Sequence, residues 1–263
     1  LFQKVLAGMD RLLMQSEVDK ERIIAIGAPT DRVEVMGTIK YDEEMPSEKG
    51  MERILASLAK HNYYGGEKIV VVGGSTWPGE EKILIDIVYR VSSINPQIRL
   101  LLVPRHVERT HEIQSIIKTK GLNCILWSSL KKDEISFNAT AKDILLVDTT
   151  GELKYFYGAA TIVFVGKSLT YHGGQNIVEP AVLGKPIIVG PNMENFLNIM
   201  NDFLSEKAII QVASQNELEK AVGMLLNDRL LCDEIGKRAA NIVAKNRGAL
   251  DKCIKAISSF IIQ

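Results

Sequence analysis

Several features that mark specialised classes of protein are scarce in this sequence. Its three cysteines, Cys124, Cys232 and Cys253, are an odd number, widely spaced and without a C-x-x-C pair. This argues against a disulfide framework and against a zinc site, and reduced cytosolic thiols are the simplest interpretation. The formal net charge is zero, with 32 basic and 32 acidic residues. A balanced charge argues against nucleic-acid binding through bulk charge and leaves only a local basic patch open.

Long hydrophobic runs are also missing. No apolar run reaches the roughly 18 residues that a membrane-spanning helix needs, and no signal peptide precedes the first predicted helix. We therefore expect the chain itself to be soluble. What is present is an ordinary globular composition, 46% hydrophobic and 24% charged, in 263 residues. That length is enough to bury a sizeable core.

Strand and helix patterns alternate along most of the chain. In the run 68–72 every residue after Lys68 is β-branched, which is typical of a buried parallel strand. The run breaks into a glycine-rich turn, and an amphipathic helix follows. The pattern predicts an α/β fold, with a Rossmann-like parallel sheet covered by helices on both faces. Further strands are predicted at 33–36, 98–103, 122–127, 143–148, 161–166, 186–189 and 208–212. Helices are predicted after Ser16, after Gly79, up to Lys120, at 151–160 and 194–204, and from about 214, 229 and 249, with polar connections at 41–49 and 128–141.

The segment from Tyr171 to Ala181 is the most informative for function. Gly173 and Gly174 let backbone N–H groups approach a ligand closely. A short helix predicted from Asn176 to Gly184 would present unpaired N–H groups to a phosphate. Glu179, about one turn into that helix, could accept hydrogen bonds from two adjacent hydroxyls such as those of a ribose.

Other polar residues follow predicted strands in the same way. Ser75, Arg105 and Thr149 each stand at the carboxyl end of a strand, as does the loop around His172. Ligands of parallel sheets gather at these ends. The sequence therefore predicts a nucleotide site at one edge of the sheet.

Taken together, these loops resemble the C-terminal half of the bacterial transferases of 3-deoxy-D-manno-octulosonic acid (Kdo). The resemblance covers nearly the whole chain, with the motifs in matching order and spacing. The matching segments are Gly74-Ser75-Thr76 with Gly79-Glu80-Glu81, the stretch 102–109, the stretch 148–153, the stretch 164–169, and His172-Gly173-Gly174 with Asn176 and Glu179-Pro180-Ala181.

The resemblance implies the C-terminal domain of a two-domain GT-B glycosyltransferase, which is inverting and takes Kdo from CMP-Kdo to a lipid A precursor in lipopolysaccharide biosynthesis. Residues 1–40 would be the tail of an N-terminal acceptor domain with the linker, 41–248 the CMP-sugar-binding domain, and 249–263 a helix packing back toward the first domain. The catalytic base and the membrane-associating part would lie before Leu1, so the chain would bind CMP but transfer little or nothing. The full-length enzyme would act at the cytoplasmic side of the inner membrane, without a cofactor, a metal or nucleic acid.

The resemblance also implies which residues contact the donor, with Arg105 stabilising the departing phosphate. The residues also allow structural roles. Ser75, Thr76 and His106 could each cap a helix. Arg105 could form an ion pair with Glu108 or Glu112. The expected donor-binding residues are Gly74, Ser75, Thr76, Pro104, Arg105, His106, Thr149, Gly151, Glu152, Gly173, Gly174, Gln175, Asn176 and Glu179.

Five positions depart from the family pattern: Trp77, Pro78, Lys167, Gln175 and Ile177. Without the resemblance, the residues leave two other functions open: a UDP-sugar epimerase of the same architecture, or a non-catalytic nucleotide-binding module.

Overall fold

The computed structural model describes residues 2–132 and 137–261. Backbone contacts divide the chain into two compact units, Leu1–Glu44 with Ile242–Gln263, and Met45–Asn241. The α-helices are α1 (Phe2–Ala7), α2 (Glu17–Ala25), α3 (Glu48–Lys60), α4 (Glu80–Ser92), α5 (Thr110–Thr119), α6 (Trp127–Lys131), α7 (Leu153–Ala159), α8 (Val178–Val182), α9 (Leu197–Ser205), α10 (Gln215–Asn227), α11 (Arg229–Asn246) and α12 (Ala249–Ile261). The strands are β1 (Leu12–Met14), β2 (Val33–Val35), β3 (Ile69–Thr76), β4 (Ile98–Pro104), β5 (Asn123–Leu126), β6 (Asp143–Leu146), β7 (Ile162–Val165), β8 (Ile187–Val189) and β9 (Ile210–Gln211).

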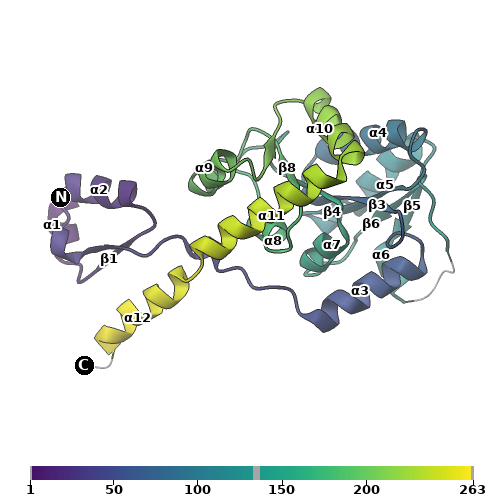
Figure 1. Ribbon diagram of the computed structural model, residues 1–263. Helices are drawn as coiled ribbons and strands as arrows, with labels where there is room; N and C mark the ends of the chain where they lie inside the picture. The colour runs from purple at the N-terminus through teal and green to yellow at the C-terminus, as the bar shows by residue number, and fades with distance from the viewer. Residues whose placement is uncertain (1, 133–136, 262–263) are drawn as a thin grey trace. The chain divides into compact units, whose positions relative to one another are not determined.

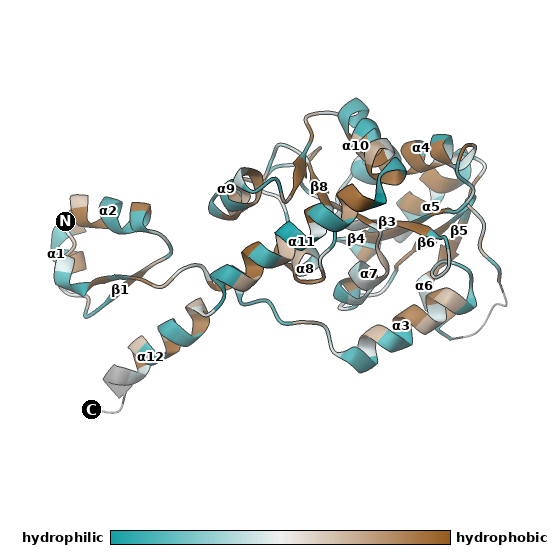
Figure 2. Ribbon diagram, viewed as in Figure 1, coloured by the Kyte–Doolittle hydropathy of each residue, from teal (hydrophilic) through white to brown (hydrophobic). Residues whose placement is uncertain are grey.

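The larger unit is built on a seven-stranded sheet in the order β5-β6-β4-β3-β7-β8-β9, and every pair in it is parallel (Figure 1). Its central strands consist mostly of apolar residues, as the hydropathy colouring shows (Figure 2), and every residue of β4 and β7 is buried. Alternate side chains of a strand point to opposite faces. One face packs against α4, α5, α10 and the start of α11, and α3, α7 and α8 lie on the other side. The fold class predicted from the sequence is confirmed.

The strand order places a topological switch point beside β3. From β3 the chain runs to β4 on one side, and after β6 it returns to β7 on the other. The loops that follow β3 and β7 therefore lead to helices on opposite faces, and the crevice between their beginnings is where open α/β sheets bind ligands.

The smaller unit joins the first residues of the chain to the last helix. Strands β1 and β2 pair in parallel, and Ser16 caps α2 by accepting the N–H of Asp19, as the sequence predicted. The carboxylate of Asp42 accepts hydrogen bonds from the N–H groups of Gly248 (2.5 Å) and Leu250 (2.7 Å) at the start of α12. The assignment of these units to an acceptor and a donor domain stays a prediction.

Three α-helices, α1, α3 and α6, were not predicted, and one is shorter than predicted. Helix α3 begins directly after the expected linker and buries Ile54 and Leu58, one turn apart. Helix α6 occupies the start of the expected loop 128–141, of which residues 133–136 lie outside the described residues. Helix α8 spans only Val178–Val182, because Asn176 turns the chain by accepting the N–H of Val178 (3.0 Å).

Candidate functional site

The carboxyl ends of three neighbouring strands bring the predicted loops together. The N–H of Arg105, after β4, donates to the carbonyl of Thr76 in β3 (3.1 Å). The N–H of Gly166, after β7, donates to the carbonyl of Gly74 (2.9 Å). Pro104 is buried and pairs in register with Thr76. The loops after β3, β4 and β7 therefore share one edge of the sheet.

Ser75 interrupts the regular register of β3. Its φ is +51°, and the pairing with β4 shifts between Gly74 and Thr76. A non-glycine residue in this region is strained, and such residues cluster at functional sites. Neither Ser75 nor Thr76 caps α4, whose N-cap is Gly79. The space left by Gly74 is taken by Tyr157, because a Cβ there would lie 2.2 Å from the Tyr157 hydroxyl.

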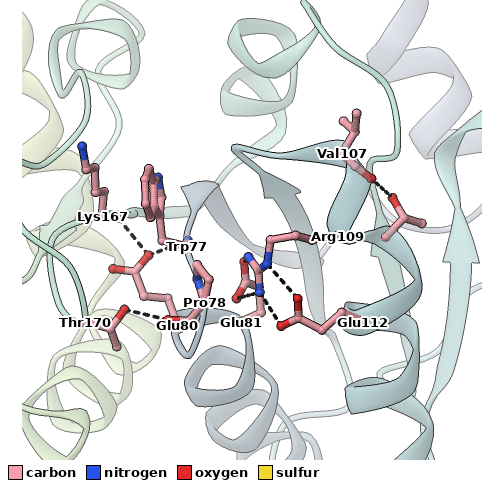
Figure 3. A network of polar contacts seen from close by, with 10 residues as sticks. Trp77, Pro78, Glu80, Glu81, Val107, Arg109, Glu112, Lys167 and Thr170 are labelled. Carbon is pink, nitrogen blue, oxygen red and sulfur yellow. Dashed lines mark hydrogen bonds and ion pairs between the residues drawn. The ribbon is translucent and has the colours of Figure 1, made fainter.

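Glu80 ties the loops after β3 and β7 together, a role that the sequence did not reveal. Its carboxylate is fully buried and accepts four backbone N–H groups, from Trp77 (2.9 Å), Lys167 (2.9 Å), Ser168 (3.0 Å) and Leu169 (3.0 Å). Figure 3 shows the bonds from Trp77 and Lys167. Burial raises the pKa of Glu80, and the four N–H donors oppose that shift. Gly166 is required beside it, since a Cβ there would lie 2.7 Å from a Glu80 carboxylate oxygen.

Glu81 and Glu112 occupy the guanidinium of Arg109, not that of Arg105. Arg109 donates to Glu81 at 2.7 and 3.2 Å and to Glu112 at 2.8 and 3.0 Å (Figure 3). Burial lowers the pKa of Arg109, but its hydrogen bonds to Glu112 and Glu81 raise it overall. The expected alternative, a pair of Arg105 with Glu108 or Glu112, is therefore wrong. The Arg105 side chain is exposed and has no hydrogen-bond or ion-pair partner among residues 2–132 and 137–261.

The half-buried ring of Trp77 lies between two loops. Its centroid is 5.2 Å from that of His106 and 5.0 Å from that of Tyr171. His106 makes no side-chain capping bond, so the capping alternative for it is not observed. Trp127 is fully buried and donates a hydrogen bond to Glu152, so neither face of its ring is open for a nucleobase to stack on.

The loop after β7 has the backbone that its glycines predicted. Gly173 and Gly174 have φ of +107° and +70°. The carboxylate of Glu194 accepts the N–H of Gly173 (2.6 Å) and lies 2.8 Å from His172 Nδ1. These contacts, the His172 side chain first, lower the pKa of Glu194 to about 2. The carboxylate thus stays charged and holds the turn throughout the neutral range.

Glu179 lies in the first turn of α8, directly after this loop. It is half-buried, and the Asn176 side-chain amide donates to it (3.2 Å). Tyr157 is fully buried; desolvation and then the charge of Glu179 raise its pKa. The Tyr157 hydroxyl also lies against Gly74 in β3.

The segment after β6 contributes differently. The carboxylate of Glu152 accepts hydrogen bonds from Thr149 (2.8 Å), Lys131 (2.9 Å), Trp127 (3.0 Å) and Arg53 (3.1 Å). Burial alone would raise the pKa of Glu152, but the bonds from Lys131, Thr149 and Trp127 lower it. Both side chains of the Thr149–Glu152 pair are engaged within the protein. A contact with the donor substrate in this segment would therefore use backbone groups, including the backbone of the exposed Gly151.

A cavity of about 960 Å³ lies at the opposite edge of the sheet. It is lined by residues that precede β3, β4 and β6, among them Lys68, Gln97 and Lys142. None of the loops predicted to bind the donor reaches it.

Within the described ranges, no group of three or more His, Cys, Asp or Glu side chains could hold a metal ion, and no helix has the length and apolar character to cross a bilayer.

Comparison with known proteins agrees with the geometry. Residues 1–43 match the family model described as 3-deoxy-D-manno-octulosonic-acid transferase (kdotransferase). A bifunctional glycosyltransferase/methyltransferase of Fusobacterium nucleatum is 33% identical over 89% of this chain and 35% of its own length. The 3-deoxy-D-manno-octulosonic acid transferase of Haemophilus influenzae is 28% identical over 98% of this chain and 59% of its own.

A solved structure extends the likeness to three dimensions. The C-terminal CMP-Kdo binding domain of WaaA from Acinetobacter baumannii matches with a TM-score of 0.65 and 26% identity, over 73% of this chain and 98% of that one. The resemblance and the GT-B donor-domain fold expected from the motifs are thus confirmed. The chain spans only about a third to three fifths of the length of the two curated relatives.

Proposed function

We propose that this chain, a relative of the bacterial Kdo transferases, is the donor-binding part of a glycosyltransferase that takes Kdo from CMP-Kdo. One observation carries the proposal: the loops after β3, β4 and β7 meet at a topological switch point and present Arg105 without a partner among the described residues. An unpaired guanidinium and a glycine turn with left-handed backbone, at the carboxyl ends of neighbouring strands, suit a phosphate.

The donor would lie along this edge. Arg105 would pair with the phosphate through its planar fork, and backbone N–H groups near Gly173 and Gly174 would add hydrogen bonds. Glu179 would accept the ribose hydroxyls. Ser75, strained at the end of β3, would contribute its hydroxyl. The remaining members of the predicted set, including Thr76, His106, Gln175 and the 149–152 segment, would surround these contacts.

The chemistry would be an inverting sugar transfer. As CMP leaves, the anomeric carbon gains oxocarbenium character and negative charge grows on the phosphate. Fixed positive groups aimed at that charge are usually the largest catalytic contribution. Arg105 would provide it here. The base for the acceptor hydroxyl would come from an N-terminal half such as the relatives have, so this chain alone would bind CMP without transferring Kdo.

The finer assignments follow from the same relationship. The acceptor would be a lipid A precursor, bound by the N-terminal half at the cytoplasmic side of the inner membrane during lipopolysaccharide synthesis. Residues 1–40 would belong to that acceptor domain with its linker, 41–248 to the CMP-sugar domain, and 249–263 to a helix returning to the first domain. The family model that matches residues 1–43 supports this division.

Glu179→Ala should weaken CMP binding about 10- to 100-fold, since it removes the acceptor of two ribose hydroxyls. Isothermal titration with CMP and with 2′,3′-dideoxy-CMP measures this, and the variant should lose the distinction between the two ligands. The control is Glu219→Ala, which should bind like the parent. Glu219 is a partly exposed residue of α10 that pairs with Arg90 of α4.

Unchanged CMP affinity in Glu179→Ala would remove the ribose assignment. Tighter binding of UDP than of CMP by the parent would overturn the donor assignment and favour the epimerase reading.

A further inference from the structure

Lys167 is the first residue after Gly166 at the end of β7. It adopts φ of +56°, a region that L-residues other than asparagine and aspartate rarely enter. Its N–H donates to the buried carboxylate of Glu80, and its carbonyl accepts the N–H of Gly174 (3.0 Å). Both the N–H and the carbonyl of Lys167 are therefore held by hydrogen bonds within the loops of the candidate site.

The ammonium group of Lys167 is directed onto that site. Nζ lies 4.8 Å from the centroid of the Trp77 ring, and the two side chains lie side by side (Figure 3). A Cβ built on Gly173 would lie 3.4 Å from the same nitrogen. The cation thus rests between the aromatic ring and the glycine turn, beside the place proposed for the phosphate.

No anion of the described chain pairs with this cation. Glu194, near the same turn, is bound to His172 and to the N–H of Gly173. Glu80 is enclosed and takes only the backbone N–H of Lys167. An aromatic face attracts a cation without neutralising it, and a half-buried charge is most stable with an anionic partner. The indole N–H of Trp77 is also buried without a partner among the described residues.

We propose that Lys167, held against Trp77, binds the carboxylate of the donor sugar. This inference rests on the proposed function, because it assumes a nucleotide-activated ulosonic acid. In such a donor the anomeric carbon carries both the phosphate and the carboxylate, so a site needs two neighbouring positive groups. Arg105 serves the phosphate and Lys167 the carboxylate, which makes Lys167 the residue that distinguishes an acidic sugar from a neutral one.

The left-handed backbone of Lys167 allows a ligand-binding role of its side chain to be told apart from a role in stabilising the loop. Glycine would occupy φ of +56° without strain, so Lys167→Gly should keep or raise the unfolding temperature. Lys207 is the matched control, since it is also a lysine with a left-handed backbone (φ +52°) and precedes β9, away from the candidate site.

The test is equilibrium binding of three ligands to the parent, Lys167→Gly, Lys167→Met and Lys207→Gly. The ligands are CMP, a hydrolysis-resistant CMP-Kdo analogue with a methylene group in place of the glycosidic oxygen, and the methyl ester of that analogue. The parent and Lys207→Gly should bind the acid about 10- to 100-fold more tightly than the ester. Both Lys167 variants should lose that preference and keep the parent's affinity for CMP.

The outcomes separate the two levels of the proposal. A parent that binds neither CMP nor the analogue removes the proposed function and this inference together. A parent that binds CMP but treats acid and ester alike removes only the role of Lys167. Equal losses for CMP, acid and ester in the Lys167 variants would also contradict it, because they would show that Lys167 supports the loop as a whole.

Discussion

Replacing Glu80 by alanine should lower the free energy of unfolding by about 3–5 kcal/mol and the unfolding temperature by about 10 °C. The carboxylate is fully buried and satisfies four backbone N–H groups from two loops. Its removal leaves those N–H groups without an acceptor and removes the hydrogen bonds through which one carboxylate holds the two loops together. Because the loops after β3 and β7 would separate, CMP binding should be lost as well. Calorimetry and titration measure the two effects.

A conservative variant and a matched control keep this prediction testable. Glu80→Gln retains the shape but presents an amide N–H₂ to N–H donors, so we expect about half the loss of stability. Glu217 accepts the N–H of Ala213 (2.8 Å) in the first turn of α10, but it is exposed and its contacts are local. Glu217→Ala should lower stability by no more than about 1 kcal/mol. Similar losses for Glu80→Ala and Glu217→Ala would show that Glu80 does not join the two loops.

Replacing Arg105 by alanine should weaken CMP binding about 100-fold and leave cytidine binding unchanged. A bidentate guanidinium–phosphate pair is among the strongest hydrogen-bonded contacts, and Arg105 has no other partner among the described residues. Arg105→Lys keeps the charge but loses the planar fork, so its affinity for CMP should lie between those of the parent and of Arg105→Ala. Titrating each variant with CMP and with cytidine isolates the phosphate contribution.

Arg109 offers the contrasting case for arginine. Its guanidinium is occupied by Glu81 and Glu112, so Arg109→Ala should destabilise the fold without abolishing the preference for CMP over cytidine. If Arg105→Ala retained that preference, the phosphate would have to bind elsewhere.

The regular parts of this fold could be predicted from the sequence because their patterns are local. The β-branched run of β3 and the alternation of strands with amphipathic helices are sufficient to predict a parallel sheet and its carboxyl edge. Helix α3 was missed although Ile54 and Leu58 have helical spacing, because it directly follows a polar segment containing Pro46. Helix α8 was predicted too long because Asn176 was expected to begin the helix, whereas its side chain turns the chain by accepting the N–H of Val178 before the helix starts.

The side-chain contacts of the site were harder to predict. Glu80 has the composition of an ordinary first helical turn, and nothing nearby shows that its carboxylate binds backbone groups almost ninety residues later. The same holds for Lys167 and Trp77, which meet only when β7 pairs with β3. Motif resemblance identified the loops, whereas the geometry showed which side chains are already engaged, such as Glu152, and which remain available, such as Arg105.

A crystal structure of the chain with CMP tests the central claim most directly. The account predicts the phosphate within hydrogen-bonding distance of Arg105 and the Gly173–Gly174 turn, with the ribose hydroxyls on Glu179. Density for CMP in the 960 Å³ cavity at the amino ends of the strands, with neither Arg105 nor Glu179 in contact with it, would contradict it.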